Sequence, residues 1–126
     1  MIGSALRVAG IDHVVLHVRD LERAKKFYIE LLGFKVAHES SWQSFLSCGS
    51  QQVALFEKRD NGEIHAGDEM NHMALRLDTG EYEDVKATLE AAGVEVHGRP
   101  GDDRCIYFND PDGHRLQVLT PAERPP

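Results

Sequence analysis

A chain of 126 residues, 41% hydrophobic and 28% charged, is long enough to bury one core, so we expect a single domain over residues 1–126. A formal net charge of −7 without a basic cluster argues against nucleic acid or an anionic membrane as partner. No apolar run approaches the ~20 residues of a membrane span, and the first residues lack the order of a signal peptide, which predicts a cytoplasmic protein. Cys48 and Cys105 form no disulfide framework and are expected to be reduced.

The first half of the chain is predicted to form a strand, a helix and three further strands. Residues 11–18 alternate in the way typical of a strand with one buried face. Asp20 is a suitable N-cap for a helix over 21–32, and Gly33 a suitable left-handed C-cap. Three more strands follow, at 34–38, 42–48 and 52–58, and residues 60–69 form a polar surface loop.

The same order of elements returns after residue 70. A strand over 70–77 precedes a helix over about 81–92, which Gly93 closes, and residues 94–96 begin another strand. The buried stripe of this helix is expected to be Tyr82, Val85, Leu89 and Ala92.

A hairpin completes the second half. Its two strands run from Arg104 and up to Thr120, with a tight turn at Asp110-Pro-Asp-Gly113 between them. His114 follows the turn and is expected to be exposed.

The two halves can be laid on each other residue by residue. Ile11-Asp-His-Val-Val-Leu matches Met70-Asn-His-Met-Ala-Leu, and Leu-Leu-Gly33-Phe-Lys-Val matches Ala-Ala-Gly93-Val-Glu-Val. The chain is therefore one strand-helix-strand-strand-strand unit written twice, as repeat 11–60 and repeat 70–120. This pattern predicts an α+β fold.

In each repeat the helix must cover the apolar face of its sheet, which leaves the other face for polar side chains. Two curved sheets joined edge to edge would bring these faces around one hollow. Two imidazoles and one amide oxygen there suit Zn, Fe, Mn, Co or Ni, with positions left open for a substrate. The side chains expected on the hollow's face are His13, His17, His72, Arg76, Tyr107, Arg115 and Gln117.

Four segments resemble the vicinal oxygen chelate superfamily of glyoxalases, bleomycin-resistance proteins, fosfomycin-resistance enzymes and extradiol dioxygenases. They are Ile-Asp-His13-Val-Val-Leu, Phe27-Tyr-Ile-Glu-Leu-Leu-Gly33-Phe, Asn-His72-Met-Ala-Leu, and Ile-Tyr107-Phe-Asn-Asp-Pro-Asp-Gly-His-Arg-Leu-Gln117. The resemblance covers nearly all of residues 11–120. It implies paired βαβββ modules forming a curved mixed sheet around a metal cavity, a divalent metal chelated by two substrate oxygens, and a homodimer that often builds the site from both chains.

The resemblance also assigns the metal ligands. His13 and His72 fall on the two histidine positions of the family, and Gln117 on the position where Glu is commonest. An amide brings no negative charge, so metal binding is expected to be weaker and the bound ion a stronger Lewis acid.

Each branch of the family fits this sequence in part. The glyoxalase branch needs a fourth ligand, a Glu, where this chain has Leu55, with Glu57 expected two residues further on the same face. The fosfomycin branch shares the Ile-Tyr107-Phe segment but extends into basic residues, whereas only Arg124 follows here. The extradiol branch shares the spacing from Tyr107 to Gln117, with His17 as its candidate for a missing histidine.

Two functions follow as hypotheses. The first is a metal-dependent enzyme in which Tyr107 assists proton transfer and Arg76, Arg115 and His17 contact the substrate, with dioxygenase or lyase chemistry ranked above thiol transfer. The second is a bleomycin-resistance-like binding protein that holds an aromatic ligand in a dimer groove without catalysis. Gln117 favours the binding protein, and the paired histidines favour the enzyme. The alternative for His13 and His72 is a pair of surface histidines with ordinary hydrogen bonds.

Overall fold

The computed structural model describes residues 5–66, 70–99 and 101–121. The first half forms β1 (His13–Val18), α1 (Leu21–Lys25), a π-helix η1 (Lys26–Leu31), β2 (Lys35–Glu39), β3 (Gln43–Cys48) and β4 (Gln51–Glu57). The second half forms β5 (Met73–Arg76), α2 (Tyr82–Ala91), β6 (His97–Arg99), β7 (Asp102–Asn109) and β8 (Arg115–Leu119).

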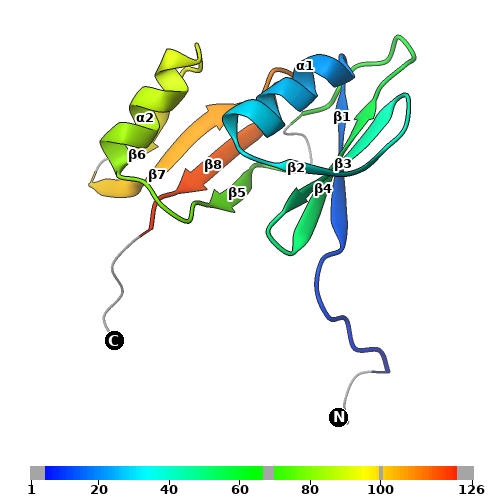
Figure 1. Ribbon diagram of the computed structural model, residues 1–126, viewed down its shortest axis with the longest axis horizontal. Coiled ribbons are helices and arrows are strands. Elements are labelled where there is room, and N and C mark those ends of the chain that lie inside the picture. The colour runs from blue at the N-terminus through cyan, green and yellow to red at the C-terminus, as the bar shows by residue number, and fades with distance from the viewer. Residues whose placement is uncertain (1–4, 67–69, 100, 122–126) are drawn as a thin grey trace.

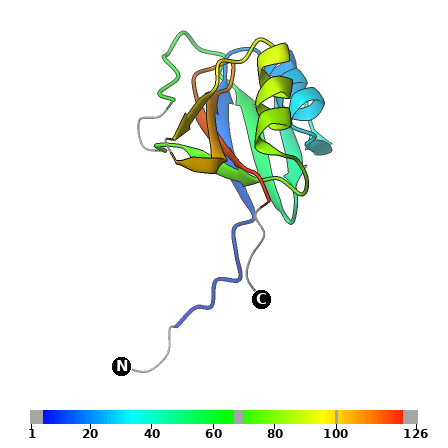
Figure 2. The ribbon, with the colours of Figure 1, turned by 90° about the vertical axis from the view of Figure 1, so that its left-hand side faces the viewer.

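These strands form two four-stranded mixed sheets with the same internal order. Sheet A has the order β1-β4-β3-β2, and sheet B has the order β5-β8-β7-β6. The β1–β4 and β5–β8 pairs are parallel, and the other pairs are antiparallel. The sheets lie side by side, with both helices along the same side of the molecule (Figures 1 and 2). The α+β prediction is confirmed.

The expected division into a buried and an open face holds for β1. On β1, Leu16 and Val18 are buried, whereas His13, Val15 and His17 are exposed. On the hairpin strands, the residues facing the helices are buried and form one core with the first half: Ile106, Phe108, Leu116 and Val118. Within the described residues, no helix has the length and apolarity that crossing a membrane requires.

The first helix differs from the regular α-helix predicted over residues 21–32. It begins as expected at Asp20, whose carboxylate accepts a hydrogen bond from the Arg23 N–H (3.1 Å). From Lys26 it widens into a π-helix, so that the Leu32 N–H donates to the carbonyl of Phe27, five residues back (3.3 Å). Tyr28 is fully buried on this turn, and Gly33 then ends it with the predicted positive φ of 81°.

Two predicted boundaries in the second half are wrong. Helix α2 stops at Ala91, so Ala92 is the C-cap and is exposed instead of lying in the core. The following strand begins at His97 and not at Val94. The residues at which a helix or strand begins and ends depend on a few weak local preferences, and contacts with neighbouring elements override them. The last three residues of the expected loop over 60–69 lie outside the described residues.

One carboxylate, that of Asp110, organises the turn between β7 and β8. Its Oδ1 accepts hydrogen bonds from the backbone N–H groups of Asp112 (2.9 Å) and His114 (2.8 Å). Its Oδ2 accepts from the Tyr28 hydroxyl (2.7 Å) and contacts His114 Nδ1 (2.8 Å). The expectation that His114 is exposed is therefore wrong: only 5% of the residue is accessible, because Asp110 holds both its backbone and its ring.

The neighbouring Asp112 joins the same turn to the start of α1. Its Oδ1 accepts hydrogen bonds from the Arg19 N–H (2.8 Å) and from the Arg23 guanidinium (3.1 Å). Through Asp110 and Asp112, one turn of the second half is tied to the only long helical segment of the first half that the structure describes. The two halves are thus locked together by polar contacts as well as by the shared core.

The surroundings of Asp110 determine its ionisation. Burial raises the pKa of this carboxyl, but the hydrogen bonds from His114 and Tyr28 together outweigh burial and hold the pKa below its ordinary value. Burial and the adjacent carboxylate raise the pKa of Tyr28 well above the ordinary value for a tyrosine. Asp110 is therefore the acceptor and Tyr28 the donor of their hydrogen bond.

Removing the Tyr28 hydroxyl should destabilise the fold. Tyr28→Phe leaves a buried carboxylate oxygen with one donor fewer, which costs about 1.5–3 kcal/mol for a hydrogen bond to a charged group. Urea denaturation of the full chain measures the free energy of unfolding. The matched control is Tyr82→Phe on α2, a half-buried tyrosine without a hydroxyl partner in the described part of the chain, and it should change stability by less than the Tyr28 variant. Equal losses in both variants would contradict the assignment.

The same carboxylate predicts how stability depends on acid. Because folding lowers the pKa of Asp110, its contribution is present above the unfolded value of about 3.9 and is lost as pH falls through the folded value. An Asp110→Asn variant should therefore be less stable than the wild type at pH 6, and this difference should shrink below about pH 4. Urea midpoints from pH 2 to 6 test this, with exposed Asp78→Asn as control. A constant difference across that range would show that Asp110 does not titrate as proposed.

Candidate functional site

The two histidines that the sequence aligns across the repeat occupy equivalent positions in the fold. His13 is the first residue of β1, and His72 immediately precedes β5. β1 and β5 are edge strands of their sheets: within the described residues, β1 pairs with β4 alone and β5 with β8 alone. Each histidine therefore stands at the start of an open sheet edge.

Each histidine is also oriented by the residue before it. His13 Nδ1 lies 2.7 Å from Asp12 Oδ2, and His72 Nδ1 lies 2.8 Å from Asn71 Oδ1. Both oxygens are acceptors, so Nδ1 carries the proton in each ring and Nε2 keeps its lone pair in the neutral form. Metal-binding histidines are usually held in this way, by a hydrogen bond on the nitrogen that does not touch the ion.

Sheet B brings four of the predicted site residues together on its open face. Tyr107 pairs with Gln117 across β7 and β8, and its ring lies edge-to-face with that of His72, with 5.7 Å between centroids. The Arg115 guanidinium carbon lies 4.5 Å from the centroid of the Tyr107 ring. A cation, a phenol, an imidazole and an amide therefore share one surface, which suits an anionic oxygen-bearing molecule.

Gln117 is buried, unlike the other members of this group. Its Nε2 donates to Cys105 Sγ. The amide nitrogen is thereby directed at the thiol, and Oε1 is the atom through which Gln117 could bind a metal.

Sheet A places an aromatic wall beside His13. The Phe45 ring lies 5.3 Å from the His13 ring and 5.8 Å from Phe56, and Trp42 lies 6.0 Å from Phe56. Sequence reasoning did not single out Phe45 or Phe56. The signal was present in the strand register, because Phe45 pairs with Ala54 and Phe56 with His17, which places both rings on the open face of β1.

The expected metal ligands lie on two different sheets. His72 and Gln117 flank Tyr107 on sheet B, whereas His13 belongs to sheet A. Among the described residues, no group of three or more His, Cys, Asp and Glu side chains could hold a metal ion, and the expected set has only two histidines besides the amide. Two imidazoles and an amide oxygen are donor types that fit a divalent metal.

The remaining two predicted contacts lie elsewhere on these faces. His17 lines a cavity beside the open edge of β1. Arg76 is exposed at the end of β5, where it lines a small cavity of about 150 Å³ together with Gly33 and Cys48. Neither residue touches the group around Tyr107 through a contact that the structure records within its described part.

Neither Leu55 nor Glu57 provides a fourth ligand on the face of His13. Leu55 is fully buried and pairs with Leu16, so it faces the core. Glu57 shares that inner face, as expected, and accepts a hydrogen bond from the Leu21 N–H (3.0 Å) at the start of α1. The fourth ligand that the glyoxalase branch needs is therefore missing at this strand.

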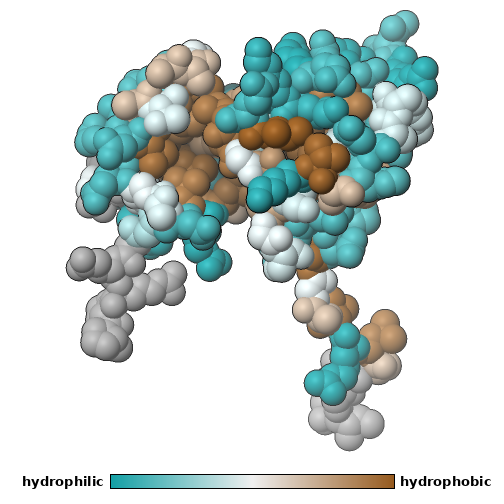
Figure 3. Space-filling view, in the orientation of Figure 1, coloured by the Kyte–Doolittle hydropathy of each residue, from teal (hydrophilic) through white to brown (hydrophobic). Residues whose placement is uncertain are grey.

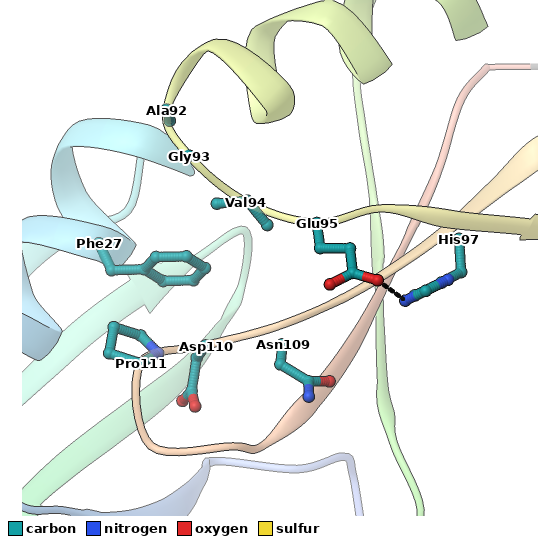
Figure 4. Close-up of a pocket in the computed structure, with 9 residues that line it drawn as sticks. All are labelled: Phe27, Ala92, Gly93, Val94, Glu95, His97, Asn109, Asp110 and Pro111. Carbon is teal, nitrogen blue, oxygen red and sulfur yellow. Dashed lines mark ion pairs between the residues drawn. The ribbon is translucent and has the colours of Figure 1, made fainter.

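A cavity of about 460 Å³ between the two halves contains none of the predicted site residues. Figure 4 shows Phe27 facing Val94 across it, with Pro111 at one end and an ion pair between Glu95 and His97 (3.4 Å) at the other. Apolar surface gathers in this region between the halves (Figure 3). Its lining mixes apolar residues with Glu95, His97, Asn109 and Asp110, and it lacks the imidazole–phenol–amide group found on sheet B.

The fold agrees with what is found by comparison with known proteins. The family model described as "Glyoxalase/Bleomycin resistance protein/Dioxygenase superfamily" matches residues 10–118. The chain belongs to this superfamily, as the sequence analysis had indicated.

Its relatives include fosfomycin-resistance proteins. The chain is 31% identical over 117 residues to the metallothiol transferase FosB of Staphylococcus saprophyticus, an alignment that covers 90% of this chain and 78% of FosB. It is 28% identical over 110 residues to the glutathione transferase FosA of Serratia marcescens, covering 86% and 78%. The crystal structure of the fosfomycin resistance protein FosX from Mesorhizobium loti superposes with a TM-score of 0.72 at 25% identity, covering 92% of this chain and 95% of that one.

These relatives bear on the ranking of reactions. The sequence analysis placed dioxygenase or lyase chemistry above thiol transfer, and the comparisons support neither dioxygenase nor lyase activity. Two of the relatives named above are thiol transferases. The branch that was ranked lower is thus the better supported one.

Proposed function

We propose that this protein is a divalent-metal-dependent enzyme that acts on a small, oxygenated, anionic molecule. The observation that carries this proposal is the pair of histidines at equivalent sheet edges, each with Nδ1 held by the preceding Asp or Asn side chain. Two unrelated surface histidines would have no reason to share both position and orientation. The arrangement leaves two Nε2 atoms available for one ion.

The metal site is completed by two copies of the chain. His72 and Gln117 of one copy provide one half, and His13 of a second copy provides the other. The support for this division is the resemblance to the superfamily, whose homodimers often build the site from both chains. A divalent ion held there supplies Lewis-acid polarisation of substrate oxygens. A neutral amide in place of a carboxylate leaves more positive charge on the ion and weakens its binding.

Residues around the ligands have distinct tasks. Arg115 provides a positive charge for an anionic group of the substrate, and its stacking on Tyr107 holds the guanidinium in place. Tyr107, beside His72, is positioned to donate a hydrogen bond or a proton to a substrate oxygen. The aromatic wall of Phe45, Phe56 and Trp42 excludes water from the His13 side. Arg76 lies further along the open face of sheet B, and His17 lies further along that of sheet A.

Among reactions, addition of a thiol to the substrate is favoured over oxygenation. The support is the similarity to the metallothiol transferase FosB over 90% of this chain. One feature departs from that branch: Gln117 stands where the family most often has Glu. This departure points to a metal affinity different from that of FosB.

A binding protein is the second candidate. The contact of the Gln117 amide with Cys105 and the aromatic wall beside His13 favour it, since neither needs a metal. Such a protein would hold a flat aromatic ligand between the two copies without changing it.

Metal analysis of purified, tag-free protein separates the two candidates. The enzyme hypothesis predicts a stoichiometric divalent metal whose affinity falls in His72→Ala by more than the about 10- to 100-fold that loss of an outer-shell partner costs. Gln117→Glu should bind the metal more tightly than the wild type. His97→Ala, which removes an exposed histidine outside the site, serves as control and should leave affinity unchanged. A metal-free protein that still binds flat aromatic molecules would favour the binding protein.

A mixing experiment tests whether the site is shared. The His13→Ala and His72→Ala variants should each fail to bind the metal. Refolding the two variants together should restore metal binding at up to half of the sites. The reason is that a mixed pair contains one site with both histidines and one with neither. Restoration would not occur if both histidines came from the same chain.

A further inference from the structure

The cavity of about 460 Å³ between the two halves is built from both repeats. Phe27 reaches it from η1, Val94 and Glu95 reach it from the segment after α2, and Asn109 and Pro111 lie at the end of β7. Its volume lies in the range of small-molecule sites. Among the described residues that line it, none has a role in the proposed metal centre or in the substrate contacts beside it.

The lining of this cavity has an apolar end and a polar end (Figure 4). Phe27 and Pro111 lie at the apolar end, whereas Asn109 and the ion pair of Glu95 with His97 lie at the polar end. A ligand that fills the cavity therefore needs an apolar surface on one side and hydrogen-bonding atoms on the other.

Phe27 forms a fixed aromatic surface at the apolar end. Its ring lies edge-to-face with that of Tyr28, with 5.2 Å between centroids, and its centroid lies 6.2 Å from that of Phe108. Both neighbours are fully buried and hold the ring in place, while Phe27 itself is only half-buried. The uncovered part of its ring is available to stack with a flat ligand ring.

Asn109 provides a hydrogen-bonding edge at the polar end. Its backbone pairs with Arg115 on β8, and it directly precedes Asp110, which four hydrogen-bond donors hold in place. Its side chain is exposed and carries an acceptor oxygen and a donor nitrogen side by side. An asparagine amide can form two hydrogen bonds at once with adenine, whose amino group and ring nitrogen are adjacent.

The charges around the cavity favour a neutral ligand. Glu95 brings an exposed carboxylate. Among the described residues of the lining, His97 is the one side chain that can become a cation, and it already lies 3.4 Å from the Glu95 carboxylate. An anionic ligand would be repelled by Glu95 without gaining a free cation.

We propose that this cavity binds a neutral, flat heteroaromatic molecule of the aminopurine type. The ring of the ligand stacks on Phe27, and the Asn109 amide recognises its amino group and the adjacent ring nitrogen through two hydrogen bonds. A hydrocarbon of the same size would cover the Asn109 amide without giving it a partner, which costs binding free energy.

The ligands 9-methyladenine and 9-methylpurine differ only in the 6-amino group and test this recognition directly. Both are titrated calorimetrically into the purified full-length protein without added metal, and the side-chain amide resonances of Asn109 are followed by NMR. 9-Methyladenine should bind about tenfold more tightly, because 9-methylpurine cannot donate a hydrogen bond to the Asn109 oxygen. It should also shift the Asn109 amide resonances.

Three variants locate the binding site. Asn109→Leu keeps a side chain of similar size without hydrogen-bonding atoms, so it should lower the affinity for 9-methyladenine to that for 9-methylpurine. Ala92→Trp fills the cavity from an exposed position of its lining and should abolish binding of both. Ala87→Trp, the same substitution at an exposed position of α2 outside the cavity, should leave binding unchanged.

Three outcomes would overturn the proposal. Equal affinities of the wild type for the two ligands would mean that the amino group is not recognised. A preference for 9-methyladenine that is unchanged in Asn109→Leu would assign recognition to another group. Binding that persists in Ala92→Trp would place the ligand elsewhere, for example at the aromatic wall beside His13. Because no metal is added, failure of the proposed metal site would not affect these results.

Discussion

The hydrogen bonds to Asp110 are the constraint on which the rest of this molecule depends. A buried carboxylate is costly unless donors surround it, and here four of them do so from two distant parts of the chain. Tyr28 reaches it from the π-helical segment of the first helix. The turn from Asp110 to His114 is therefore shaped by the first half of the chain as much as by its own residues. It sets the start of β8, the strand that carries Arg115 and Gln117.

Open sheet edges are the second organising feature. β1 and β5 each have one unpaired side, and unpaired strand edges in native proteins are usually covered or blunted. The two oriented histidines stand at the starts of these same strands. A site completed by two copies would place function where the fold already needs a partner.

The proposed metal ligands carry less negative charge than a ligand set that includes a carboxylate. Gln117 contributes a neutral oxygen, and its amide nitrogen is engaged by Cys105. Positive charge on the sheet B face comes from Arg115, and from a metal if one is bound. Such a face discriminates in favour of anions, whereas the cavity beside β1 is lined by apolar side chains and by side chains of both charges.

Local patterns in the sequence determined the fold class, the repeated order of elements and the open faces of the strands. Alternation along a strand and a glycine after a helix act over a few residues, so His13, His17 and His72 could be assigned to exposed faces, and Gly33 and Gly93 to helix ends, without coordinates. Tertiary structure alone decided the burial of His114, the inward register of Leu55 and Glu57, and the aromatic wall of Phe45 and Phe56. These features depend on which distant strand or helix lies opposite, and that information is absent from the spacing of residues along the chain.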